Sequence, residues 1–316
     1  MVRKIALEEH FLSPGLVDYW RPTMTEVPVP LVETLYRRLT DFGDERLSIM
    51  DRAGIAKAVL SVSGPGVQAE RDPALATRRA AEANDFLANV ITRRPERYAG
   101  FAHIAVQDAN AAARELERCV SQFGFKGAMI NGHTNGLYLD DRSLDPFWEA
   151  AERLSALIYI HPTDPLVPAP VLNGVPALRR ATWECGFETG SHALRLVFSG
   201  LFDRFPKAKV ALGHMGETLP YLLWRFDSRA KLYGVKLRKE PSQYIKDNIV
   251  VTVSGVYAAE PLRCALDALG RDKVMFAADY PFENAEEAGQ FMDKVALDDS
   301  ERADVAYNNA AKLLSL

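Results

Sequence analysis

The chain has 316 residues, of which 48% are hydrophobic and 25% charged, and its formal net charge is −4. This composition is that of an ordinary globular protein with enough apolar mass for a full core, and it gives no reason to expect binding to nucleic acid or to an anionic membrane. Three widely spaced cysteines without a CxxC motif, an N-terminus without an apolar leader and the lack of any long apolar run predict a cytoplasmic protein with no membrane span.

Eight short apolar runs recur along the chain, and segments of helical periodicity lie between them. The predicted strands are residues 4–7, 56–62, 98–104, 127–130, 157–160, 210–213, 249–253 and 274–278. The predicted helices are residues 46–53, 73–93, 109–123, 146–154, 189–202, 219–232, 259–269 and 285–295. Such alternation is typical of parallel strands covered by helices. It predicts a single (β/α)8 barrel domain over residues 1–316, with an open doubly wound sheet as the alternative.

Two stretches lack a regular pattern, residues 13–32 and the proline-rich residues 161–180. We expect both to form lids or pocket walls rather than linkers between domains. No GxGxxG motif follows the first strand and no GxxxxGK[ST] motif occurs, which disfavours a nucleotide-binding sheet.

Ionisable side chains stand at the carboxyl ends of the predicted strands, where the active site of a (β/α)8 barrel forms. Glu8 and His10 follow the first strand, and alternation along an extended chain places both on one side, with Glu9 on the other. His161 follows the fifth strand and Asp279 the eighth, which neighbours the first strand in a closed barrel. Two carboxylates and two imidazoles suit one divalent ion, zinc or manganese, and leave positions open for water or substrate.

Each of these residues alone also has an ordinary structural interpretation. Glu8 and His10 could mark an exposed strand end, and His161 could be a hydrogen-bonded core histidine. The four together favour a metal site, because burying an unpaired carboxylate such as Asp279 after an apolar strand is costly. His214 follows the sixth strand and could be a ligand, an acid–base group or a core residue, and the pattern leaves these alternatives open.

The sequence gives weaker reasons to assign other polar residues to the site. Glu217 and Arg225 follow His214 along the chain and could form only a surface ion pair. We expect His103 and His133 to be pocket-wall or structural residues. His192 lies within a predicted helix, where we expect it to pack against its neighbours.

Six stretches of the sequence resemble the metal-dependent amidohydrolase superfamily, and within it the branch of nonoxidative decarboxylases that includes γ-resorcylate and 2,3-dihydroxybenzoate decarboxylases. They are KIALEEHF, SVSGPGVQ, GFKGAMING, IHP, HALRLVFSGLFDRFPKAKVALGHMGETLPYLLWRFD and FAADYPFEN. The resemblance spans nearly the whole chain. It implies a distorted (β/α)8 barrel, one Mn²⁺, Zn²⁺ or Mg²⁺ ion, an aromatic carboxylate substrate and a homodimer or homotetramer.

The resemblance also assigns roles to the residues that match the family's motifs. The expected metal ligands are Glu8, His10, His161 and Asp279. The expected catalytic residues are Asp279, His214 and Glu217, and the expected substrate-binding residues are Asn131 and Arg225. Thr163-Asp164 and Cys185 stand where relatives usually carry Arg-Asn and a pocket aromatic, so the identity of the substrate stays open.

We therefore expect a carboxy-lyase that protonates the ring carbon of an ortho-hydroxybenzoate-type acid and then releases CO2. Asp279 is the expected proton donor. A carboxylate beside a divalent cation has a lowered pKa, so the proton has to arrive with the substrate, and Asp279 relays it. The alternative is a hydrolase of a lactone, ester or amide, although the first strand offers Glu-x-His rather than His-x-His and the fourth lacks a bridging lysine. A metal-stabilised binding protein without chemistry is the third hypothesis.

Overall fold

The computed structural model describes residues 1–316. Its strands are β1 Lys4–Phe11, β2 Ile55–Val62, β3 Tyr98–Gly100, β4 Ala102–His103, β5 Gly127–Asn131, β6 Leu157–His161, β7 Lys209–Leu212, β8 Ile249–Thr252 and β9 Val274–Met275. β3 and β4 are two halves of one predicted strand. The eight predicted strands are therefore all present, with bounds that differ by a few residues.

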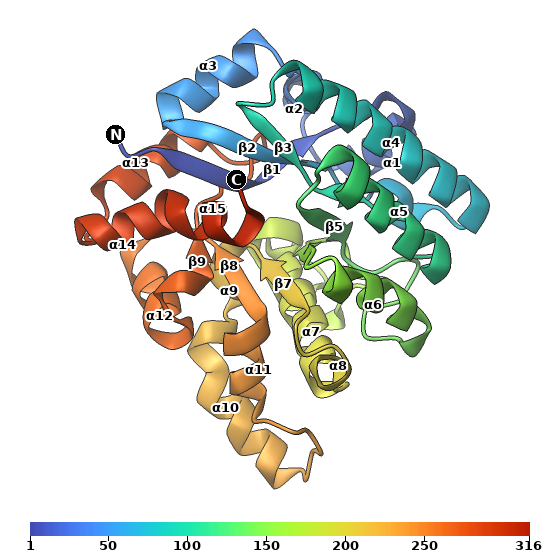
Figure 1. Ribbon diagram of the computed structural model, residues 1–316, viewed down its shortest axis with the longest axis vertical. Helices are drawn as coiled ribbons and strands as arrows, with labels where there is room; N and C mark the ends of the chain where they lie inside the picture. The colour runs from blue at the N-terminus through green and yellow to red at the C-terminus, as the bar shows by residue number, and fades with distance from the viewer.

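The strands close into a barrel through two seams. β1, β2 and β3 form one parallel group and β4 to β9 form another. At the first seam the amide of Phe101 donates to the carbonyl of Leu60 in β2 at 2.9 Å. At the second, the amide of His10 donates to the carbonyl of Tyr280 at 2.8 Å, and Glu9 forms a parallel bridge with Tyr280. The result is the distorted (β/α)8 barrel of Figure 1, which confirms the predicted fold.

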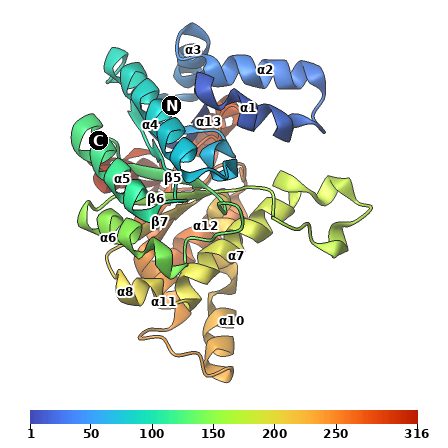
Figure 2. The same cartoon turned by 90° about the vertical axis from the view of Figure 1, so that its right-hand side faces the viewer.

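Helices surround the barrel in both views (Figures 1 and 2). They are α1 Val17–Trp20, α2 Val29–Thr40, α3 Asp44–Ala53, α4 Pro73–Arg93, α5 Ala109–Phe123, α6 Asp145–Arg153, α7 Glu184–Phe198, α8 Leu201–Arg204, α9 His214–Glu217, α10 Leu219–Leu232, α11 Pro241–Asn248, α12 Ala259–Leu269, α13 Ala285–Lys294, α14 Asp299–Ala303 and α15 Asn309–Leu314. α4, α5, α10 and α12 have the predicted bounds. α2, α9, α11, α14 and α15 were not predicted, and α1 and the start of α2 lie within the stretch that was expected to be irregular.

Two of the four helices that were predicted to the residue have strong local signals at their ends. Asp72 caps α4 by accepting hydrogen bonds from two amides of its first turn, and Pro73 occupies the first helical position. Asp108 caps α5 in the same way, and Gly124 ends it in the left-handed conformation with φ of 69°. These signals are local, so the sequence alone locates the ends of both helices.

The apolar side chains form two layers. A cluster of 69 buried residues fills the space between the strands and the surrounding helices. A smaller cluster of 13 buried residues fills the inside of the barrel, and it includes Ile5, Tyr159 and Met275. Leu314 of α15 belongs to this inner cluster, and α15 lies across one end of the barrel in Figure 1. The barrel is therefore packed from that end, which leaves polar groups to occupy the other end.

An irregularity in β1 determines which way its polar residues point. The pairing register between β1 and β2 shifts between Ala6 and Glu9, as it does where an extra residue bulges out of a strand. Leu7 therefore belongs to the inner core cluster, while Glu8, the next residue, also faces side chains of strands β6 and β8. Glu9 points to the opposite side, where it lines a cavity with Arg46 of α3. The predicted strand ended at residue 7, but β1 continues past the bulge to Phe11.

Two segments project from the barrel in Figure 2. One joins β6 to α7 and contains three short 3-10 turns, Pro170–Leu172, Pro176–Leu178 and Arg180–Thr182. The other is the pair α10 and α11 with the loop between them. Several of their apolar side chains are exposed, namely Leu166, Val167, Val171, Trp183, Tyr221, Trp224 and Tyr233. No helix combines the length and the apolar character that crossing a membrane requires.

Candidate active site

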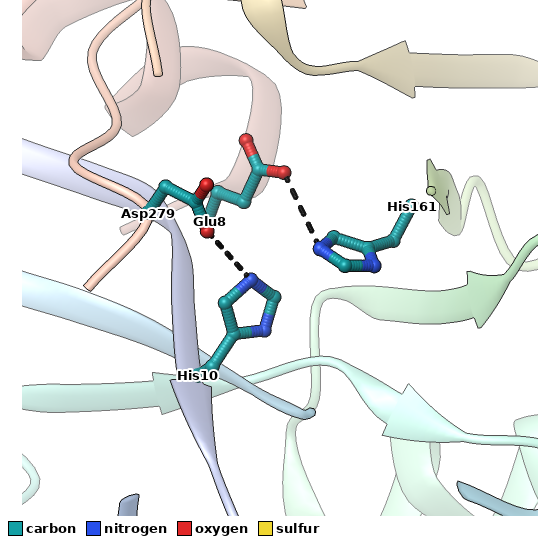
Figure 3. A group of neighbouring side chains, drawn as sticks. All are labelled: Glu8, His10, His161 and Asp279. Carbon is teal, nitrogen blue, oxygen red and sulfur yellow. Dashed lines mark ion pairs between the residues drawn. The ribbon is translucent and has the colours of Figure 1, made fainter. Parts of the chain in front are cut away.

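Four of the predicted site residues converge at one end of the barrel (Figure 3). Glu8 and His10 come from β1, His161 ends β6, and Asp279 follows β9. Each offers one potential ligand atom, and these atoms all lie within 4.8 Å of one another. His10 Nε2 is 3.1 Å from Asp279 Oδ1, and His161 Nε2 is 3.9 Å from Glu8 Oε1. The arrangement brings two carboxylates and two imidazoles around one point.

The hydrogen bonds of these residues fit a single divalent ion at that point. Glu8 Oε1, His10 Nε2 and Asp279 Oδ1 are all buried, and no well-aligned hydrogen bond within the protein satisfies them, although the last two atoms lie 3.1 Å apart. Leaving such groups unsatisfied is expensive, and a cation that accepts their lone pairs removes the cost. His161 donates from Nδ1 to the carbonyl of Pro162 at 3.0 Å, which leaves the lone pair on Nε2 for a metal. Mixed carboxylate and imidazole ligands suit Mn²⁺ or Zn²⁺.

Three side chains hold the other oxygen of Glu8. Tyr159 donates a hydrogen bond to Glu8 Oε2 at 2.6 Å, Thr252 donates at 3.4 Å, and Ser254 donates as well. Burial raises the pKa of Glu8, and a divalent ion at Oε1 would counter this by stabilising the carboxylate. These three residues were not predicted from the sequence to support the site. Tyr159 did carry a signal, because it lies two residues before His161 and therefore on the same face of β6.

The rings of both histidines are oriented by a contact at the nitrogen that faces away from the metal position, and His161 is a neutral imidazole. Burial lowers the pKa of His161 to about 3, so its ring carries no charge near neutral pH. His10 Nδ1 lies 3.4 Å from the hydroxyl of Ser61 in β2, and its Nε2 faces Asp279. A neutral imidazole whose one nitrogen is engaged by the protein presents the other to a metal in a fixed orientation.

His214 and Glu217 form a hydrogen-bonded pair beside Asp279. His214 donates from Nδ1 to Glu217 Oε1 at 2.7 Å, and its Nε2 lies 3.7 Å from Asp279 Oδ2. Burial alone would lower the pKa of His214, but its interactions with the two carboxylates outweigh this and hold the pKa well above its usual range. Gly255 makes room for the ring, because a Cβ there would lie 2.9 Å from His214 Cδ2. The pair can therefore hold a positive charge next to Asp279.

The backbone of this pair is strained. Residues 214–218 all have positive φ, between 50° and 78°, and only Gly216 among them is a glycine. Asp279 also has positive φ, at 55°. Each non-glycine residue in this conformation costs about 1–2 kcal/mol. Strain of this kind concentrates at functional sites, where it directs particular side chains toward a ligand. The local sequence gave no sign of it, because only the glycine is typical of a left-handed position.

Asp279 is ionised in this environment. Burial opposes its ionisation, but hydrogen bonding and charge interactions with His10 and His214 outweigh burial and hold the pKa of Asp279 below its usual range. The residue therefore lacks a proton of its own near neutral pH, so any proton that it passes on has to come from another group.

The two predicted substrate-binding residues lie in different settings. Asn131 ends β5 and is buried directly beside His161 in the strand pairing. Its Nδ2 donates to the carbonyl of Val62 at 3.4 Å, and its Oδ1 has no partner. Arg225 lies on the exposed side of α10 and forms no hydrogen bond or ion pair with the four converging residues or with His214 and Glu217. The structure thus brings Asn131 to the site but not Arg225.

The remaining histidines lie outside the group. His103 Nε2 accepts a hydrogen bond from the amide of Val67 at 2.9 Å, and His192 Nε2 accepts one from Leu139 at 3.0 Å. Burial lowers the pKa of both rings to about 3. His133 is near Tyr138, and its Nε2 is 3.2 Å from the carbonyl of Asp164. These contacts are structural, as the sequence analysis expected.

Cys185 is the one thiol near the His214–Glu217 pair. Burial raises its pKa to about 12, and the negative charges of Asp164 and Glu217 act in the same direction. The thiol is therefore protonated near neutral pH and is a poor nucleophile. Chemistry through a cysteine thiolate is disfavoured at this site.

Comparison with known proteins establishes the family. A model of the amidohydrolase family matches residues 18–316. The chain belongs to the amidohydrolase family. It is 40% identical to a gamma-resorcylate decarboxylase of Rhodococcus jostii, over 100% of this chain and 99% of that protein.

Two solved structures of decarboxylases are similar to this family member over its full length. One is a 2,6-dihydroxybenzoate decarboxylase complexed with 2,6-dihydroxybenzoate, with a TM-score of 0.94 and 37% identity over 100% of both chains. The other is a dihydroxybenzoic acid decarboxylase from a Polaromonas species with bound manganese and the inhibitor 2-nitroresorcinol. Its TM-score is 0.94, with 39% identity over 100% of this chain and 98% of that chain.

Proposed function

We propose that this protein is a metal-dependent nonoxidative decarboxylase, a carboxy-lyase, of an ortho-hydroxybenzoate-type acid. The observation that carries the proposal is the convergence of unpaired ligand atoms from Glu8, His10 and Asp279 on one point, with a charged His214–Glu217 pair adjoining Asp279. The named activities of the full-length relatives support it, since they act on dihydroxybenzoates. Glu8, His10, His161 and Asp279 would hold the metal ion.

The metal, when bound, supplies positive charge that fixes an aromatic carboxylate and its neighbouring hydroxyl in place. Glu8 is held by Tyr159, Thr252 and Ser254, so its free oxygen Oε1 stays aimed at the metal position. Asn131 has an unpaired Oδ1 at the wall of the site, available to a donor on the substrate. These groups orient the ring without taking part in proton transfer.

Asp279 moves the proton. Its ionised carboxylate accepts the proton of the substrate phenol and delivers it to the ring carbon that bears the carboxylate. The bond between that carbon and the carboxylate then breaks, its electron pair restores the aromatic ring, and CO2 leaves. The phenolate regains a proton from solvent, so one proton is consumed for each CO2 released. His214, 3.7 Å from Asp279 Oδ2, stabilises the carboxylate between these steps.

Turnover in D2O separates this reaction from hydrolysis by the same family. A decarboxylase places one deuterium at the ring position that the carboxylate leaves, and it releases CO2. A hydrolase instead cleaves an ester, lactone or amide and adds oxygen from solvent. The expected result with 2,6-dihydroxybenzoate or a related acid is a ring-deuterated product, identified by NMR and mass spectrometry. Solvent oxygen in a product, with no CO2 from any hydroxy-aromatic acid, would instead establish the hydrolase.

Glu217→Gln tests the role of the catalytic pair. Glutamine keeps the size of the side chain but removes the charge that supports a protonated His214. We expect kcat to fall by about 10²–10³-fold, in the range of general acid–base effects, while the metal content stays unchanged. Glu188→Gln is the matched control, because Glu188 is another buried carboxylate of this region and bonds only Tyr138. Equal effects of the two substitutions would refute a specific role for Glu217.

We also propose that residues 1–316 act as one domain in a cytoplasmic homodimer or homotetramer, with Mn²⁺ or Zn²⁺ as the metal. All three cysteines are free, which suits a reducing compartment. The exposed aromatic residues Tyr221 and Trp224 of α10 support self-association, because contiguous exposed apolar side chains are typical of subunit interfaces. Arg225 follows Trp224 on the same helix and is also exposed, so its predicted substrate-binding role would require a second subunit. Light scattering at several concentrations measures the oligomeric state.

A further inference from the structure

A small cavity lies behind β1, on the side away from the four converging residues. Its polar lining consists of Glu9, Arg46 and Tyr280, and apolar side chains of α3, β2 and α13 complete it. The volume within which the centre of a water molecule can lie is about 10 Å³. This is enough room for one such molecule. The three polar residues that line it are each buried.

Two polar atoms of the residues that line this cavity lack partners within the protein. Arg46 Nη1 and the hydroxyl of Tyr280 are both buried and have no hydrogen-bond partner. Glu9 uses Oε1 to accept from the amide of Ala278 at 2.9 Å, which leaves its second oxygen for another donor. A buried polar group without a partner costs about 1–3 kcal/mol. Two donors and one acceptor around a space of this size are what a buried water molecule requires.

We infer that this cavity holds one fixed water molecule, and that the water, together with Arg46, Glu9 and Tyr280, holds the backbone of His10 in place relative to Asp279. The water accepts hydrogen bonds from Arg46 Nη1 and from the hydroxyl of Tyr280, and it donates one to the free oxygen of Glu9. All three groups are then satisfied. The guanidinium also lies over the ring of Tyr280, 4.8 Å from its centroid, which fixes the donors relative to each other.

The same three residues are bonded to the backbone on either side of the metal position. Arg46 Nη2 donates to the carbonyl of His10 at 2.7 Å. Glu9 holds the amide of Ala278, the residue before Asp279, and the carbonyl of Tyr280 accepts from the amide of His10 at 2.8 Å. The bound water joins these contacts into one unit across the seam between β1 and the segment after β9. Arg46 and Tyr280 are therefore positioning residues, which act on a metal through the ligands that they hold.

Tyr280→Phe tests this unit, and the test rests on the metal site proposed above. The substitution removes one donor to the water and keeps the ring that faces Arg46. We expect the dissociation constant for Mn²⁺ to rise about tenfold, the lower end of the effect of residues that support metal ligands. The electron paramagnetic resonance spectrum of bound Mn²⁺ should change as well, because the ligand geometry relaxes. Tyr98→Phe is the control, since Tyr98 is also buried and donates to the carbonyl of Phe42 at 3.0 Å outside the cavity.

A crystal structure of the wild-type protein tests the water directly, whatever the variants do. The expected result is one water within hydrogen-bond distance of Arg46, Glu9 and Tyr280. An empty cavity overturns the proposal. A filled cavity with unchanged Mn²⁺ affinity and spectrum in Tyr280→Phe, or equal changes in Tyr98→Phe, overturns the positioning role. Wild-type protein that binds no divalent metal refutes the proposed metal site instead, and the crystal structure still decides whether the water is present.

Discussion

Replacing Asp279 with asparagine is expected to lower kcat by at least about 10²–10⁴-fold, the range in which general acid–base residues contribute. Asparagine keeps the shape of the side chain, but its amide cannot accept the substrate's proton and pass it to the ring carbon. Asparagine would also lose the charge interactions with His10 and His214 that stabilise the ionised carboxylate. Steady-state kinetics with an ortho-hydroxybenzoate measures the loss, and isothermal titration should still detect binding of the acid.

Metal loss has to be separated from loss of the proton relay, because Asp279 belongs to both. The assay is therefore run with excess Mn²⁺, and bound metal is measured on the same sample. Asp293→Asn is the control, since Asp293 pairs with Lys4 far along β1 and should leave kcat unchanged. A metal-loaded Asp279→Asn variant with turnover near the wild-type value would show that another group carries the proton. His214, which already contacts Asp279 Oδ2 at 3.7 Å, would then be the first alternative.

The convergence of the residues at the strand ends was predictable because it follows from the topology of the whole barrel rather than from local sequence. In a barrel of parallel strands, every carboxyl end meets at the same end of the molecule, so Glu8, His10, His161 and Asp279 could be placed together without a structure. Their residue types indicated a metal site, because two carboxylates and two imidazoles are rarely buried together without a cation. The structure brings these four residues within 4.8 Å of one another, as the sequence analysis expected.

The hydrogen bonds that hold the proposed metal ligands in place were not predictable from the sequence pattern alone. Ser254 reaches Glu8 across 246 positions of the chain, and Arg46 reaches the carbonyl of His10 from a helix whose sequence is typical of a solvated face. Contacts of this kind depend on which side chains the fold brings together in three dimensions. The bulge in β1 is similar, since an alternating strand pattern does not reveal that Leu7 and Glu8 face the same interior.

Three of the helices that were not predicted share one feature, which α14, capped by Asp298, lacks. α2, α11 and α15 have no strong capping side chain, and their first residues form no side-chain hydrogen bond of that kind. They are stabilised by packing, as in α15, where Leu314 belongs to the core inside the barrel. Most helical stability in proteins comes from such tertiary contacts rather than from local preference. Local signals therefore predicted α4 and α5 to the residue and gave no indication of α15.

Replacing His161 with alanine is expected to remove most of the bound metal. The wild-type protein should carry about one divalent ion per chain, held by four protein ligands. Without the imidazole, Glu8, His10 and Asp279 remain, but too few ligands are left to compete well with water and chelators. Elemental analysis after dialysis against a weak chelator measures the change, and activity should fall in proportion to the metal.

His192→Ala is the matched control for this loss. It removes another buried imidazole whose pKa burial lowers to about 3, but His192 only accepts a hydrogen bond from the amide of Leu139. The control should therefore lose stability and keep its metal. Circular dichroism melting curves show whether each variant is folded before its metal is counted. A folded His161→Ala protein that retains one tightly held ion would show that His161 is a core histidine. The proposed ligand set would then be wrong, because the remaining three residues would suffice to hold the metal.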